Sequence, residues 1–218
     1  MAAAEFIPIL LKGALVSLLI AGAASLVAVV MAFIAGFAKL SRHRLVRWTA
    51  ACYVEFFRGT SLLVQLFWLF YVLPHFGILL PPYAVAVAAL GLNMGAYGSE
   101  VVRGAIISVP RAQIEATIAL NMTKHLAMRR IVLPQALLTM LLPWGNLLII
   151  LFKSTSIVSL ITIHDLAFNA YNLNIQTFAT VPIYLSTLII YFVVVQAIAF
   201  SVAALYRVVN RGCVGKLA

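Results

Sequence analysis

Acidic residues are scarce in this chain. Only 5 of its 218 residues are Asp or Glu, against 15 Lys and Arg, and charged residues of both signs make up 9% of the sequence. Soluble domains usually carry about 25% charged residues, so this composition, with 65% hydrophobic residues, excludes a soluble globular domain. The two cysteines are too few for a disulfide framework. The sequence therefore predicts an all-α integral membrane protein.

Motifs of enzymes are also absent from the sequence. There is no Gly-rich loop ending in Lys-Ser or Lys-Thr, so the chain cannot bind ATP in that way. No Gly-any-Ser-any-Gly elbow or carboxylate pair indicates hydrolysis. The four histidines fall in separate segments without metal-ligand spacing: His43, His75, His125 and His164. We expect no catalytic residue, no metal site and no cofactor bound by this chain.

Long apolar runs divide the chain, as one transmembrane domain, into five expected membrane-spanning helices. A helix needs about 20 apolar residues to cross a bilayer core. No charge occurs between Gly59 and Ser99, which is too long for one helix, but prolines and Gly77 break this run into a hairpin. The expected spans are residues 13–38, 52–73, 83–104, 131–152 and 183–206. The polar segment between Ser154 and Pro182 predicts a short helix at the outer face.

Lys and Arg residues near the span ends set the expected orientation, because cytoplasmic loops are enriched in them. Lys12 and Lys153 fall on one side, and eleven fall on the other: Lys39, Arg42, Arg44, Arg47, Arg111, Lys124, Arg129, Arg130, Arg207, Arg211 and Lys216. The N-terminus should therefore lie outside and the C-terminus inside. This asymmetry explains the net charge of +10, and we expect no nucleic-acid partner.

The polar, basic segment ahead of the fourth span, residues 108–130, predicts two short helices at an angle. Proline belongs in a first helical turn, so one helix should run from about Pro110 to Leu120. Asn is the best non-Gly residue for the left-handed position that ends a helix, which Asn121 would occupy. Thr123 can cap the second helix. The two helices would form a compact knob.

A spaced pattern runs through the same segment. Glu115-Ala116 is followed by Asn121 and then by Ile131-Val132-Leu133-Pro134. The pattern resembles the cytoplasmic coupling loop of the membrane subunits of ATP-binding-cassette (ABC) importers, which reads Glu-Ala-Ala, three residues, Gly, nine residues, Ile-any-Leu-Pro. Here Thr117 replaces the second Ala and Asn121 replaces the Gly. The resemblance implies residues that couple the chain to an ATPase: Pro110, Glu115, Ala116, Leu120 and Asn121.

Three further stretches are similar to the polar amino-acid permeases of that family. The first is Tyr53-Val-Glu55-Phe-Phe-Arg58-Gly59-Thr60-Ser-Leu-Leu-Val-Gln65. The second is Leu92-Asn93-Met-Gly95-Ala-Tyr97-Gly-Ser-Glu100-Val-Val-Arg103-Gly104, followed by Ser108-Val109-Pro110. The third is Leu151-Phe-Lys153-Ser154-Thr155-Ser156. The subfamily includes permeases for histidine, glutamine, arginine, opines and ectoine. The resemblance implies a type I ABC importer fold, a location in the bacterial cytoplasmic membrane and a polar amino acid or related zwitterion as cargo.

The family resemblance also implies partners. They are a second permease subunit, identical or paralogous, two cytoplasmic ATPases that bind ATP and Mg²⁺, an extracytoplasmic substrate-binding protein and the lipid bilayer. Two alternatives stay open. A secondary transporter would usually show an inverted repeat and midplane carboxylates, and a small membrane enzyme would need a cluster of titratable residues facing one leaflet.

Charged residues inside the expected spans form two pairs. Glu55 with Arg58 and Glu100 with Arg103 are each spaced i, i+3, so each pair shares a helix face. A charge at mid-bilayer costs about 2.5–3.5 kcal/mol on insertion scales, so we expect all four near the inner interface. We interpret them as a structural charge cluster that can belong to the inner gate, in preference to direct substrate contacts.

Uncharged polar residues lie deeper. Asn93 and Tyr97 are spaced i, i+4 near the middle of the third span, and Asn146 lies inside the fourth. Such groups can hydrogen-bond a zwitterion without the cost of a buried charge, and they can equally hold helices together. We expect them to line the substrate pathway. Gly91 and Gly95 form a GxxxG element that predicts close helix packing.

Overall fold

The computed structural model describes residues 6–214, and the regular secondary structure of this part of the chain is entirely helical, without a strand. The α-helices are α1 (Ile7–Lys39), α2 (Arg44–Gly59), α3 (Leu62–Phe67), α4 (Pro82–Ile107), α5 (Arg111–Ala119), α6 (Lys124–Ala127), α7 (Leu133–Ser154), α8 (Leu166–Thr177) and α9 (Thr180–Val214). Short π-helical turns cover Trp68–Val72 and Met128–Val132, and 3₁₀ turns cover Leu73–Phe76 and Thr155–Ile161. The predicted all-α fold is confirmed.

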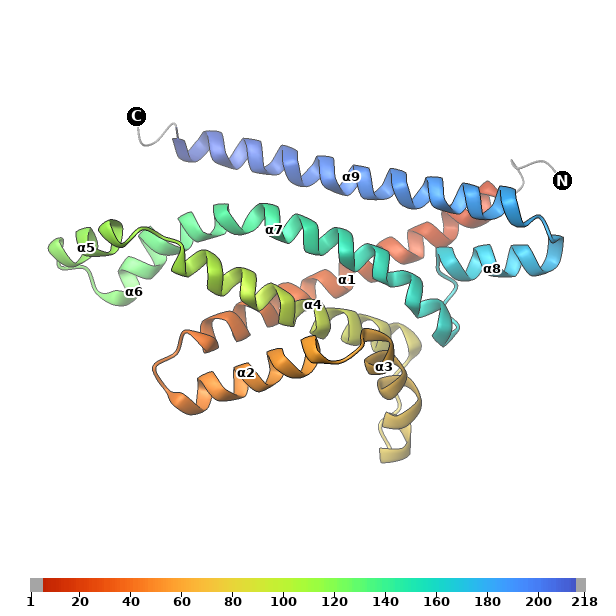
Figure 1. Cartoon of the computed structure of the whole chain (residues 1–218), viewed down its shortest axis with the longest axis horizontal. Coiled ribbons are helices and arrows are strands. Elements are labelled where there is room, and N and C mark those ends of the chain that lie inside the picture. Colours follow the sequence, from red (N-terminus) through yellow and green to blue (C-terminus); the bar gives the residue numbers. More distant parts are fainter. Residues whose placement is uncertain (1–5, 215–218) are drawn as a thin grey trace.

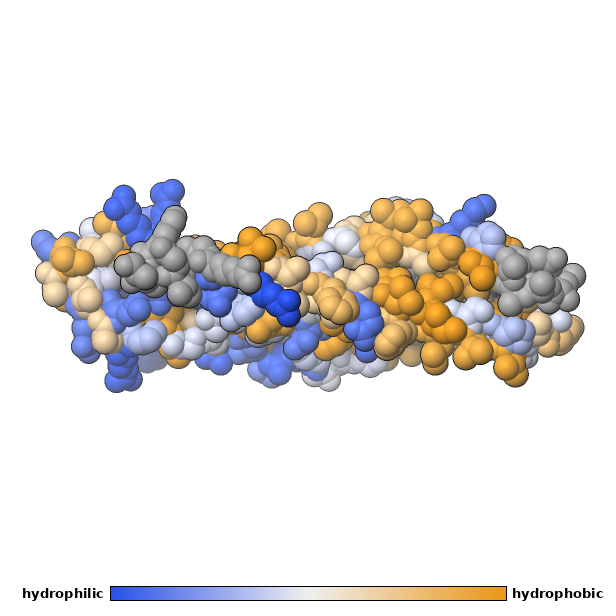
Figure 2. Space-filling model, turned by 90° about the horizontal axis from the view of Figure 1, so that it is seen from above, coloured by the Kyte–Doolittle hydropathy of each residue, from blue (hydrophilic) through white to orange (hydrophobic). Residues whose placement is uncertain are grey.

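The long helices α1, α4, α7 and α9 run along the longest axis of the molecule, and α5 and α6 form a knob at one end (Figure 1). Within the described residues, four helical stretches are long and apolar enough to cross a membrane, and the number is five if the bent pair of α2 with residues 62–76 counts as one span. In the face drawn in Figure 2, hydrophilic residues gather at the knob end and apolar residues cover much of the rest.

The expected second span, residues 52–73, is not one straight helix. The helix α2 begins earlier, at Arg44, and ends at Gly59, and the next helical stretch lies at 103° to it. The break occurs because Thr60 and Ser61 have extended backbones, with ψ of 152° and 132°. Hydropathy alone cannot reveal such a bend, since both halves are apolar enough for a membrane. The expectation of a single helix over these residues was therefore wrong.

The helices α1 and α4 run in the same direction. Lys39, at the end of α1, forms an ion pair with Glu100, near the end of α4. Because both helices end on the same side, residues 40–81 must carry the chain back to the opposite end (Figure 1). The bent pair and the segment up to α4 therefore act together as one crossing.

Small residues allow α1 and α4 to pack closely. A Cβ added at Gly91 would lie 2.7 Å from the Val27 Cβ, and one added at Gly95 would lie 2.8 Å from the Met31 Cβ. Neither position has room for a side chain, because the opposing atoms belong to the neighbouring helix. The close packing predicted from the GxxxG element is confirmed.

The polar segment after α7 contains the short helix that the sequence predicts, α8. Asp165 caps its start, since the Asp165 Oδ1 accepts a hydrogen bond from the Phe168 N–H at 2.9 Å. Apolar residues of α1, α8 and α9 pack together there: Leu10, Ala14, Leu166, Ala170, Leu173 and Ile183. The helix lies at the end of the molecule opposite the knob (Figure 1).

Candidate functional site

The turn between α5 and α6 is closed by the backbone. Asn121 has φ of 53°, the left-handed conformation expected of it. Its N–H donates to the Ile118 carbonyl, and the Met122 N–H donates to the Thr117 carbonyl, both at 2.9 Å. This pair of bonds is the Schellman ending of a helix, in which Gly or Asn takes the left-handed position. Asn121 can therefore stand where the importer pattern has Gly.

Thr117, which stands where the importer pattern has its second Ala, is buried on the knob. Its hydroxyl donates to the Ile114 carbonyl at 2.6 Å within α5. Because a buried polar group is costly only when it lacks a partner, this internal bond lets Thr replace Ala. The second helix is capped as expected, since the Leu126 N–H donates to the Thr123 Oγ1 at 3.4 Å.

The outer surface of the knob combines a free carboxylate with exposed apolar side chains. Glu115 is exposed, and it has no ion pair or side-chain hydrogen bond with any residue that the structure describes. Ile118 and Leu120 are 70% and 73% exposed. Pro110, Ala116 and Asn121 are also exposed. Apolar side chains exposed together on an otherwise polar surface are typical of a protein interface.

The knob is firmly joined to the long helices. The Gln135 side chain of α7 donates a hydrogen bond to the Gln113 side chain of α5. Val109 and Val132 are buried at the base of the knob, in one cluster with Val102 and other residues of α4 and α7. The helix α6 also continues through the π-helical turn into α7. A force on the knob is therefore transmitted to α4 and α7.

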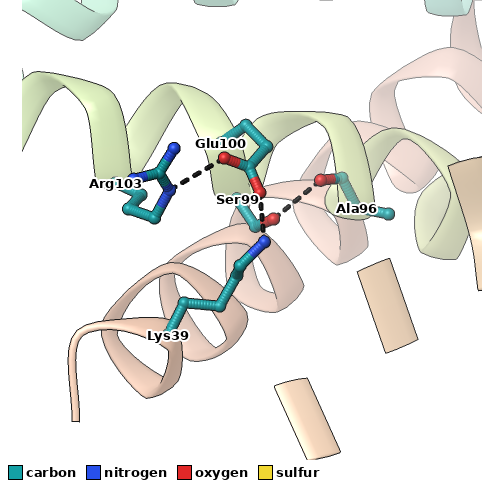
Figure 3. Close-up of polar contacts among 5 residues, drawn as sticks. All are labelled: Lys39, Ala96, Ser99, Glu100 and Arg103. Carbon is teal, nitrogen blue, oxygen red and sulfur yellow. Dashed lines mark hydrogen bonds and ion pairs between the residues drawn. The ribbon is translucent and has the colours of Figure 1, made fainter. Parts of the chain in front are cut away.

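A charged cluster joins the ends of α1 and α4 (Figure 3). The Glu100 carboxylate accepts a hydrogen bond from the Lys39 ammonium and another from the Arg103 Nε at 2.8 Å. Figure 3 also shows the Ser99 hydroxyl, which bonds the Ala96 carbonyl within α4. Sequence reasoning placed Lys39 in a loop and missed its pairing, because only the packing of α1 on α4 brings it to Glu100.

The structure does not bring the four charged candidates into one cluster. Glu55 and Arg58 form no ion pair with each other or with another described residue. The Arg58 guanidinium instead lies over the Tyr97 ring, 5.2 Å from its centroid. The expectation of a four-residue cluster was wrong, because Glu100 pairs with Lys39 and Arg103 while Arg58 packs on the Tyr97 ring.

Asn93, Tyr97 and Asn146 do not converge on one point. Asn93 is buried, and its amide donates to the Phe57 carbonyl at 2.9 Å and to the Gln65 Oε1 at 3.1 Å. Asn93 therefore joins α4 to both sides of the break between α2 and α3. This contact fits the alternative in which such polar groups hold helices together. Tyr97 and Asn146 are exposed, as groups lining a pathway would be.

A shallow groove of about 270 Å³ runs between α4 and α7. Its lining comes from Glu100, Val101, Gly104 and Ala105 of α4, from Ser108 directly after α4, and from Thr139 and Pro143 of α7. Tyr97 precedes Val101 by four residues and Asn146 follows Thr139 by seven, so each continues one wall of the groove. This face holds polar groups at positions where a lipid-facing helix would have apolar ones.

Comparison with known proteins identifies the family. A family model described as "binding-protein-dependent transport system inner membrane component" matches residues 7–213. The chain belongs to this family. It is 43% identical over 188 residues to a probable amino-acid ABC transporter permease protein, y4tF, of Sinorhizobium fredii, covering 84% of this chain and 79% of that protein. It is also 37% identical over 183 residues to the L-cystine transport system permease protein TcyB of Bacillus subtilis, covering 84% and 76%.

A solved structure shares the fold of this family member. A chain in the crystal structure of an amino acid ABC transporter with histidines is 31% identical to it, with a TM-score of 0.88, and the match covers 94% of this chain and 95% of that one. Membership in the family makes the chain a translocation subunit of a membrane transport system. It gives no support to the alternatives of a secondary transporter or a membrane enzyme.

Proposed function

We propose that this chain is the permease subunit of a binding-protein-dependent ABC importer for polar amino acids or related zwitterions, opines and ectoine included. The observation that carries the proposal is the knob of α5 and α6, which exposes Glu115 beside apolar residues and is fixed to α4 and α7. The relatives named as permeases for amino acids and L-cystine support the class of cargo.

The proposed assembly has three kinds of protein component besides the lipid bilayer. Two permease subunits, identical or paralogous, face each other, and two cytoplasmic ATPases hold ATP and Mg²⁺. A substrate-binding protein delivers cargo from outside the bacterial inner membrane. Three exposed polar side chains on α4 and α7, Tyr97, Thr139 and Asn146, support a second permease, because polar groups at membrane depth are stable against protein or a water-filled path and not against lipid.

Coupling then follows from the rigidity of the knob. An ATPase groove that closes on α5 moves the knob, and the knob moves α4 and α7 with it. Large switches of this kind need a rigid element between two packed arrangements. Glu115 is the proposed docking residue, because a carboxylate can accept charge-assisted hydrogen bonds from Arg or backbone N–H groups of the ATPase.

The test is the substitution Glu115→Lys, with Gln176→Lys in α8, at the opposite end of the molecule, as the control. We expect Glu115→Lys to abolish ATPase association and uptake while the protein still inserts in the membrane, because it reverses the charge at the interface. Gln176→Lys should retain ATPase association. The measurements are co-purification with the ATPase and uptake in proteoliposomes, and full association and uptake by Glu115→Lys would disprove the coupling role.

A further inference from the structure

The first half of α2 stands clear of the rest of the chain. Every residue from 42 to 49 is exposed, and the first buried residue of the helix is Ala50. Residues 44–47 alone make a full helical turn, so the helix is open on all sides there. Leu45 is 72% exposed and Trp48 is 66% exposed. Apolar side chains of this size, without cover from their own chain, need an apolar surrounding outside it.

One side of α2 is apolar along its length. Leu45, Trp48 and Phe56 are all exposed, and at 3.6 residues per turn they lie on the side of the helix that faces away from the buried Ala50 and Val54. The 16 residues of α2 span about 24 Å, which is less than the roughly 30 Å of a bilayer core. The helix therefore enters the membrane from one surface and ends inside it, with its apolar side toward the lipid.

Three arginines accompany this apolar side. Arg42 precedes α2, and Arg44 and Arg47 lie one turn apart on its exposed first half. Among the described residues, none of the three has an ion pair or a side-chain hydrogen bond. The sequence from residue 40 to residue 54 contains no Asp or Glu, and Lys39 before it is already bonded to Glu100. The start of α2 therefore holds an uncompensated positive charge beside apolar side chains.

The start of α2 lies at the same end of the molecule as the knob (Figure 1). Trp is favoured at the boundary between acyl chains and head groups, and a long Arg side chain reaches from apolar surroundings to the head-group layer. A guanidinium also binds phosphate oxygens through paired N–H bonds. We propose that Arg42, Arg44 and Arg47, with Leu45 and Trp48 among the acyl chains, form a binding surface for anionic phospholipids in the leaflet next to the knob.

Charge makes this surface selective among lipids. The phosphate of phosphatidylcholine has its own quaternary ammonium group as counter-ion, whereas the phosphate of phosphatidylglycerol has none. Since the surface has three guanidinium groups and no carboxylate, it favours the lipid with net negative charge. Lys39 does not add to this preference, because Glu100 neutralises its charge. The inference goes beyond the proposed import and does not depend on the cargo.

The test uses the fluorescence of Trp48 in the purified full chain, reconstituted in vesicles of equal parts phosphatidylcholine and phosphatidylglycerol. Bromine on the acyl chains of one lipid quenches a tryptophan that touches that lipid. The difference between the parent and Trp48→Phe isolates the signal of Trp48 from that of Trp68 and Trp144. We expect brominated phosphatidylglycerol to quench Trp48 on the order of twofold more than brominated phosphatidylcholine does. Equal quenching, or no quenching by either lipid, would overturn the proposal.

Two double variants locate the preference. Arg44→Gln with Arg47→Gln removes two charges from the surface and should make the two lipids quench Trp48 equally. Lys12→Gln with Lys153→Gln removes two exposed charges near the start of α1 and the end of α7, at the opposite end of the molecule, and should retain the preference. Arg42→Gln changes only the loop before α2 and should weaken the preference without altering the helix. A preference that survives the arginine variants, or that the lysine variant also loses, would disprove the surface.

A cytoplasmic protein would also suit an exposed basic surface, and co-purification with the ATPase separates the two partners. Arg44→Gln with Arg47→Gln should retain the ATPase as the parent does. Loss of the ATPase would assign these arginines to that interface and refute the lipid surface. A parent that retains no ATPase but shows the quenching preference would contradict the proposed function while supporting the lipid surface.

Discussion

At the scale of single residues, Asp165 combines two opposed environments. One carboxylate oxygen caps α8, whereas the other is buried without a hydrogen-bond partner among the described residues. Burial raises the pKa of Asp165 to about 6, against about 3.9 for an unperturbed Asp, although the backbone bonds oppose this shift. The folded chain therefore holds a proton at Asp165 that the unfolded chain releases at lower pH.

The sign of the resulting pH dependence follows from linkage. Between about pH 4 and pH 6 the folded state binds more protons than the unfolded state, so the free energy of unfolding falls as pH rises through this window. The free energy of unfolding falls by on the order of 2–3 kcal/mol at most over this window. Asp165→Asn keeps a capping oxygen without a charge, and we expect it to remove this fall. The measurement is the melting temperature of both proteins in detergent from pH 4.5 to 7.5, and a parent that becomes more stable relative to Asp165→Asn as pH rises would contradict the assignment.

At the scale of elements, the contact between α1 and α4 depends on glycine. An added Cβ at Gly91 would lie 2.7 Å from Val27 Cβ, on the neighbouring helix, whereas one at Gly22 would meet nothing within 4 Å. Inserting a methyl group into a packed helix interface forces backbone shifts that typically cost about 1–3 kcal/mol. The same substitution on the open face of α1 should have little effect, since no neighbour must move.

Gly91→Ala should therefore lower the melting temperature of the purified chain, while Gly22→Ala should leave it unchanged or raise it slightly, because Ala favours a helix more than Gly does. Both variants add one methyl group to a long helix, so they form a matched pair. The melting temperature in detergent is the measurement. If the two variants had the same melting temperature, close packing at Gly91 would not contribute to stability.

At the scale of the whole molecule, the parallel course of α1 and α4 fixes how often the chain crosses. The Lys39–Glu100 ion pair puts the two helix ends on one side, so the bent pair must supply a crossing between them. Reporter fusions after Lys39 and Lys124 should then report the cytoplasm, and fusions near His75 and Asn172 the outside. A cytoplasmic signal at Asn172 would break the five-crossing topology, and an outside signal at Lys39 would invert the proposed orientation. A fusion after Lys216, beyond the described residues, should also report the cytoplasm.

The features that the sequence alone determined are local in the chain. The apolar runs predict the long helices because each run satisfies its own backbone hydrogen bonds and only its length and polarity matter. Asn121 and Thr123 predict the turn and cap of the knob because both act on backbone groups within a few residues. The GxxxG element predicts a close contact, although not the helix that makes it.

Only the tertiary structure decided the features that join distant segments. Thr60 and Ser61 break the second span, and nothing in hydropathy distinguishes a bent pair of helices from a straight one. Asn93 bonds the end of α2, and the Tyr97 ring lies under Arg58 instead of beside a second charged pair. Lys39 meets Glu100 across 61 residues of sequence. Each of these contacts depends on which helices are neighbours and on how each helix is rotated about its own axis. Side-chain packing in the folded chain determines both.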